Sequence, residues 1–117
     1  MSEMPEGARD KLMGLQQLQQ QLQALTMQKQ TIQMQLAEID NALNELKDVK
    51  TEKVYELVGN ILVNKKPVDL NKSLVDKKER YDLRIESIEK QLKRVTIKAQ
   101  DLQKDIMGLA QKGGKKE

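Results

Sequence analysis

The chain has 117 residues, of which 33% are charged and only 2% aromatic, and its formal net charge at pH 7 is +3. It contains no Cys and no His, so a disulfide framework, a thiol nucleophile, an imidazole base and a zinc-finger ligand set are excluded. A globular core of this size usually includes several large aromatic side chains, whereas a coiled-coil seam needs mainly Leu and Ile. The composition therefore favours a coiled-coil binding protein over an enzyme, with no cofactor and no metal.

The first predicted element is a helix over residues 4–49. Pro5 suits the first turn, where its missing N–H costs nothing, and Glu6 favours the positive end of the helix dipole. Apolar residues then recur at alternating spacings of three and four, which is the period of a coiled-coil seam. The seam positions are Leu15, Leu18, Leu22, Leu25, Ile32, Leu36, Ile39, Leu43 and Leu46.

Residues 54–64 are predicted to form a β-hairpin, with two strands around a Gly59-Asn60 turn. Apolar residues emerge on both faces, and an isolated hairpin of this kind is only marginally stable in water. Either the hairpin folds over the end of its own coiled coil, or several copies pair edge to edge and face to face, which we favour. The expected assembly residues are Val54, Tyr55, Leu57, Val58, Gly59, Asn60, Ile61, Leu62 and Val63.

Pro67 ends the second strand, and a second helix is predicted over residues 68–112, followed by a flexible tail at 113–117. The fold class is therefore mainly α: a long antiparallel two-helix coiled coil with a single β-hairpin between the helices, forming one domain over residues 1–117. The seam of the second helix consists of Leu74, Tyr81, Ile85, Ile88, Leu92, Val95, Ala99, Leu102, Ile106 and Leu109.

Lysines interrupt this apolar seam. Lys29 occupies a seam position, and a lone lysine there usually specifies register or oligomeric state at some cost in stability. Antiparallel pairing, in which the numbers of facing residues add to about 117, places Lys29 near Glu89. Lys11 and Lys78 interrupt the seam in the same way near the start of each helix.

The two chain ends are expected to meet at the end of the coiled coil opposite the hairpin. Apolar residues there outnumber the seam positions that could bury them, and Met suits surfaces that accept varied apolar partners. Loose packing of the helix ends is the alternative interpretation. The candidate binding residues are Met4, Ala8, Leu12, Met13, Leu15, Ile106, Met107, Leu109 and Ala110.

No segment approaches the roughly 18 apolar residues that span a bilayer, and no apolar secretory segment is present at the N-terminus. A cytoplasmic location is therefore expected. Cations alternate with carboxylates along both helices and stacking aromatics are scarce, so neither a nucleic acid nor a membrane is an expected partner.

Four segments resemble the beta class of prefoldin subunits, and archaeal ones most. The most specific is the hairpin, and the others are the Gln-rich run of the first helix, a short segment around Lys29, and three residues of the second helix. In order they read Leu15-Gln16-Gln17-Leu18-Gln19-Gln20-Gln21-Leu22, Gln28-Lys29-Gln30, Val54-Tyr55-Glu56-Leu57-Val58-Gly59-Asn60-Ile61-Leu62-Val63, and Leu83-Arg84 with Gln91.

This resemblance implies an ATP-independent chaperone that holds unfolded polypeptides and passes them to a group II chaperonin. It also implies a hexamer of two alpha and four beta subunits, in which the hairpins form a β-barrel platform and the helix tips hold the client. The charged run Arg9-Asp10-Lys11 departs from an apolar tip. The alternative function is a coiled-coil scaffold or tether that binds one specific folded partner.

Overall fold

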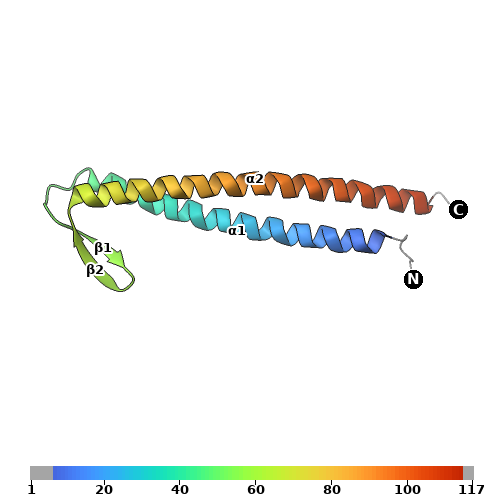
Figure 1. Cartoon of the computed structure of the whole chain (residues 1–117), viewed down its shortest axis with the longest axis horizontal. Coiled ribbons are helices and arrows are strands. Elements are labelled where there is room, and N and C mark those ends of the chain that lie inside the picture. The colour runs from blue at the N-terminus through green and yellow to red at the C-terminus, as the bar shows by residue number, and fades with distance from the viewer. Residues whose placement is uncertain (1–6, 115–117) are drawn as a thin grey trace. The chain divides into compact units, whose positions relative to one another are not determined.

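The computed structural model describes residues 7–114, which form two helices and, between them in the sequence, a two-stranded sheet (Figure 1). The order is α1 (Ala8–Leu46), β1 (Val54–Val58), β2 (Ile61–Lys65) and α2 (Pro67–Gly114). The expected fold class is thus confirmed. The chain divides into two compact units: unit 1 contains the described residues up to Lys29 and from Ser87 onward, and unit 2 is Gln30–Glu86. No helix within residues 7–114 is long and apolar enough to cross a membrane.

Helix α1 ends earlier than its sequence pattern predicts. The expected start at residue 4 lies outside the described residues, and the expected end at residue 49 is wrong because the helix stops at Leu46. The amides of Lys47, Asp48 and Val49 each donate to the carbonyl three residues earlier, at 3.2 to 3.3 Å. Such bonds tighten the last turn and satisfy carbonyls that an α-helix end leaves open.

Helix α2 is longer at both ends than the predicted 68–112. It begins at Pro67, where a missing N–H costs nothing, and the amide of Leu70 donates to the carbonyl of Lys66 at 3.0 Å. It runs through Gly113 to Gly114, so the predicted flexible tail at 113–117 is wrong for these two residues. A glycine weakens a helix by about 1 kcal/mol relative to Ala without excluding it.

Burial along each helix follows the predicted seam. Every apolar seam position is buried or half-buried, whereas the positions between them are mostly exposed. In unit 1 the most buried seam residues are Ile88 and Ala99, and in unit 2 they are Ile32 and Ile39. Leu70, one turn before the predicted seam of α2, is also buried in unit 2.

Each lysine that interrupts the seam forms an ion pair with a carboxylate of the opposite helix. In unit 1 the Nζ atom of Lys29 lies 3.7 Å from Glu89 Oε1, which confirms the predicted partner, and that of Lys11 lies 3.6 Å from Asp105 Oδ2. The third pair, in unit 2, joins Lys78 Nζ to Asp40 Oδ1 at 2.7 Å. The hydrogen bond and charge of Asp40 raise the pKa of Lys78 above its ordinary 10.5.

The hairpin is part of unit 2 and has a two-residue turn. Strands β1 and β2 pair antiparallel, with Leu57 opposite Leu62 and Val58 opposite Ile61. Gly59 has a φ of 61°, and among the described residues no amino acid other than glycine has a positive φ. A positive φ at the first turn residue only is typical of a type II′ turn, whose twist matches that of the flanking strands.

Candidate functional sites: the tip surface and the hairpin

The paired ends of α1 and α2 in unit 1 bring the candidate binding residues together. We call this region the tip surface. Ala8 is 3% exposed and belongs to the core, and Leu15, Ile106 and Leu109 are half-buried at the seam. Leu12 is half-buried outside the seam, and Met13, Met107 and Ala110 are exposed. Met4 lies outside the described residues. The tip surface therefore comprises Leu12, Met13, Leu15, Ile106, Met107, Leu109 and Ala110.

The exposed methionines of the tip surface occupy different sides of it. Met107 and Ala110 lie on the same flank of the seam as Leu12, because these positions have matching places in the heptads of the two helices. Met13, which is 55% exposed, takes the heptad position opposite the seam and points away from α2. The charged run beside it is partly neutralised, since Lys11 pairs with Asp105. The main apolar flank is therefore built from Leu12, Met107 and Ala110.

Apolar exposure also occurs outside the tip surface, which the sequence analysis missed. Met27 and Met34 are 61% and 67% exposed and share the heptad position of Met13. Leu83 and Ile97 take the equivalent position on α2 and are exposed as well. The signal was present in the sequence, because apolar residues that recur at seven or fourteen residues outside the seam share one helix face.

The hairpin exposes nearly all of its apolar side chains. Tyr55, Leu57 and Leu62 share one face and are 62 to 67% exposed. On the other face Ile61 is 68% exposed, while the Lys65 Nζ donates to Glu56 Oε1 at 2.8 Å and both side chains are half-buried. Within unit 2 the strand β1 shares a hollow with α1 and α2, but the helices leave most of the hairpin's apolar surface exposed. This exposure favours pairing with other copies over a hairpin that only covers its own coiled coil.

Comparison with known proteins gives one consistent result. Residues 9–113 match a family described as prefoldin subunit. A prefoldin subunit beta of Archaeoglobus fulgidus is 38% identical to this chain, over 93% of the length of this chain and 95% of its own length. One from Sulfurisphaera tokodaii is 36% identical over 92% of this chain and 87% of its own. The crystal structure of the prefoldin beta subunit from Thermococcus strain KS-1 superposes with a TM-score of 0.81 at 30% identity, covering 92% of this chain and 96% of that one.

Proposed function

Because the chain belongs to the prefoldin family, and its relatives there are beta subunits, we propose that it captures unfolded polypeptides as an ATP-independent chaperone subunit. The tip surface holds the client, and a group II chaperonin receives it. The working assembly is a cytoplasmic hexamer of two alpha and four beta subunits. Pairing of the exposed hairpins with those of other subunits closes the assembly.

The observation that carries this proposal is the exposure of Met107 and Ala110 beside Leu12, where no described residue covers them. Met107 is 62% exposed, so its complete burial against a client contributes about 1 to 2 kcal/mol. One tip therefore binds weakly. Several tips around one client raise the effective concentration and retain what a single tip would release. Weak individual contacts also allow transfer to the chaperonin.

The test compares two double variants in the assembly reconstituted with an alpha-class subunit. Met13→Gln with Met107→Gln removes the exposed methionines of the tip surface. Met27→Gln with Met34→Gln removes two equally exposed methionines outside it. The readout is the concentration of assembly that halves aggregation of a chemically unfolded protein without ATP. We expect about a tenfold increase for the tip variant and little change for the control.

Two results would contradict the proposal. An equal or larger effect of the control variant would place the client surface along the outer face of α1. If the wild-type assembly protects no unfolded protein and instead binds one folded partner, the chain is a scaffold.

A further inference from the structure

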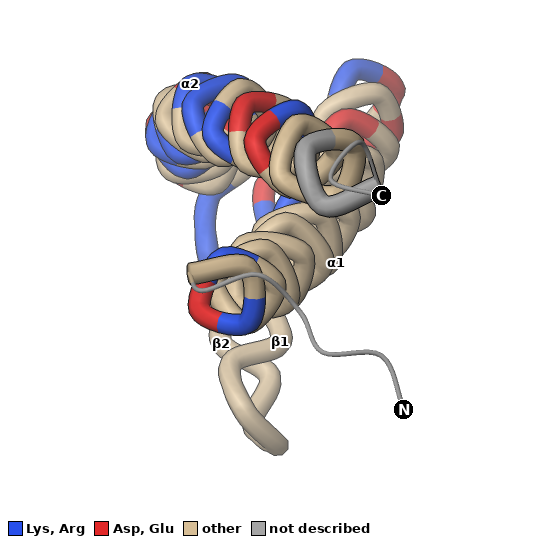
Figure 2. The backbone as a smooth tube through the Cα atoms, turned by 90° about the vertical axis from the view of Figure 1, so that its right-hand side faces the viewer, with Lys and Arg blue, Asp and Glu red and all other residues tan. Residues whose placement is uncertain are grey.

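Positive charge is concentrated in one part of unit 1. Between residues 90 and 100 helix α2 carries four cations and no carboxylate, whereas residues 12–28 of α1 carry no charge at all. Figure 2 shows long uncharged stretches of α1 in tan, whereas α2 carries both blue and red segments. The four cations of this segment are Lys90, Lys93, Arg94 and Lys98.

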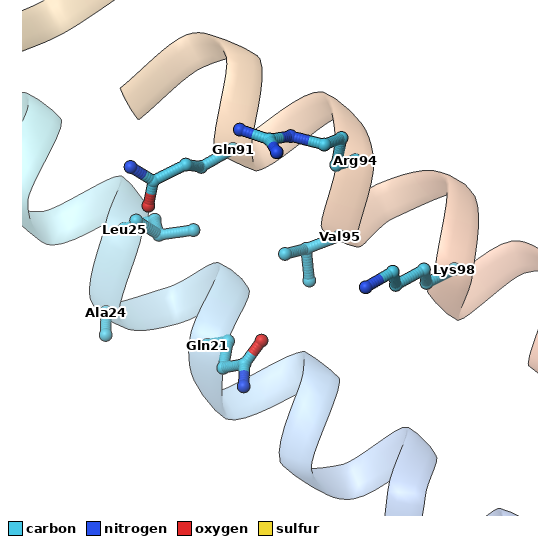
Figure 3. Close-up of a pocket in the computed structure, with 7 residues that line it drawn as sticks. All are labelled: Gln21, Ala24, Leu25, Gln91, Arg94, Val95 and Lys98. Atoms are coloured by element: carbon cyan, nitrogen blue, oxygen red, sulfur yellow. The ribbon is translucent and has the colours of Figure 1, made fainter. Parts of the chain in front are cut away.

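A groove of about 510 Å³ lies between the two helices at this point. Its floor includes the half-buried side chains of Leu25 and Val95. Figure 3 shows Val95 and Lys98 extending from α2 toward α1, and Arg94 running along α2 toward Gln91. One flank of the groove is therefore cationic, and the other is neutral, with Ala24 and the amide of Gln21. We call this site the cationic groove.

Arg94 and Lys98, the two cations that line the groove, have no partner among the residues that the structure describes. Neither Arg94 nor Lys98 forms an ion pair there, and the carboxylates of Glu89 and Asp105 pair with Lys29 and Lys11. Asp101 lies three residues after Lys98 without bonding to it. Like charges four residues apart weaken a helix by a few tenths of a kcal/mol. Helix stability therefore does not explain this arrangement.

Along the helix axis, Arg94 and Lys98 are separated by about the same distance as alternate carboxylates in an extended chain. Four residues of helix rise by about 6 Å, and carboxylates two residues apart in an extended chain are about 6.6 Å apart. The residues between those carboxylates point to the opposite side, where the groove is neutral and apolar. Tyr55 and Tyr81 lie outside the groove, so it offers no ring for stacking a nucleic-acid base.

We propose that the cationic groove binds extended acidic segments of unfolded clients, in which carboxylates alternate with apolar residues. This inference rests on the proposed function and adds a client preference to it. Acidic segments dock along α2, while purely apolar segments depend on the tip surface alone. The chain thereby favours acidic clients at low salt.

The test measures binding of two fluorescent peptides to the full assembly by anisotropy. In one peptide Glu alternates with Leu and Ala, and in the other Gln replaces every Glu. Arg94→Gln with Lys98→Gln should weaken binding of the Glu peptide about fivefold and leave the Gln peptide unchanged. The matched control is Lys93→Gln with Lys104→Gln, which removes the same charge from α2 outside the groove and should change binding less than about twofold.

Raising the salt from about 0.05 M to about 0.5 M should reduce the difference between the two peptides. Equal affinity of the wild type for both peptides, or equal effects of the two double variants, would overturn the groove proposal. So would stronger binding of poly-uridylate than of the Glu peptide. The aggregation assay separates the two proposals, since protection of an uncharged client supports the proposed function whatever the Glu peptide does.

Discussion

The hairpin offers the sharpest test of how this chain assembles. Leu57 and Leu62 face each other across the two strands and are 67% and 66% exposed in the single chain. Replacing both with Gln removes the apolar surface while adding no charge, so electrostatic repulsion between subunits cannot account for the result. The control is Leu83→Gln with Ile97→Gln, which removes exposed apolar side chains from α2.

The structure sets the size of the expected effect. Complete burial of a Leu side chain is worth about 1.5 to 3 kcal/mol, and about two thirds of that surface remains available here. Each leucine then contributes about 1 to 2 kcal/mol, and the pair about 2 to 4 kcal/mol per hairpin. This corresponds to about 30- to 700-fold weaker association at each hairpin contact.

The assay is the mass of the assembly during serial dilution, measured by light scattering. The hairpin variant should dissociate at much higher concentration than wild type and keep its helical circular dichroism. Ile61→Lys with Val63→Lys tests the opposite face in the same way, and we expect smaller species there too. If the leucine variant and the helix control dissociate at the same concentration, the hairpin does not hold the assembly together.

Two further predictions concern the seam lysines. Lys29→Leu should raise the melting temperature by the equivalent of about 1 kcal/mol, because the lost ion pair is partly exposed and the new apolar side chain is largely buried. A lower melting temperature would contradict this account. The pKa of Lys78 is raised in the folded state, so its pair with Asp40 stabilises the fold fully below pH 10.5. This stabilisation is lost as the pH rises through the raised pKa. The melting temperatures of wild type and Asp40→Asn should therefore converge at high pH. A difference that persists in strongly alkaline solution would show that Asp40 acts through another contact.

The helices and their pairing could be predicted because a heptad pattern carries its own geometry. The seam positions, the antiparallel direction and the partner of Lys29 all follow from a period of 3.5 residues and a short connection. The end of α1 could not be predicted in this way. It depends on three backbone hydrogen bonds around Leu46, which the side-chain pattern does not encode.

The candidate binding surfaces were harder to define from sequence. Counting apolar residues identified the tip surface, but Ala8 proved to be buried and Met13 points away from the main apolar flank. The cationic groove was also missed, because the net charge of +3 is modest and the cations alternate with acids over most of α2. The excess of cations in residues 90–100 is visible in the sequence, but only the packing of this segment against an uncharged stretch of α1 shows that Arg94 and Lys98 line a groove without a carboxylate.

The seam lysines explain how this chain obtains one register from a repetitive sequence. A seam of Leu and Ile repeats every seven residues, so a shift of α2 by one heptad would keep apolar residues opposite one another. In the observed register the numbers of each lysine and its partner add to between 116 and 118.

A shift of seven residues in one direction would place Lys11 opposite Lys112 and Lys78 opposite Lys47, so two attractive pairs would become repulsive. A shift in the other direction would place Lys11 opposite Lys98 and Lys78 opposite the uncharged Gln33, while Lys29 would face a new carboxylate, Asp82. Each exposed pair contributes at most about 1 kcal/mol, but both shifts leave fewer attractive pairs and add at least one repulsive pair, so the observed register differs from each alternative by more than any single pair. The register matters for function because only the observed one sets Leu12 beside Met107 and Gln21 beside Lys98. The lysines therefore lower the stability of the seam but align the two proposed binding surfaces.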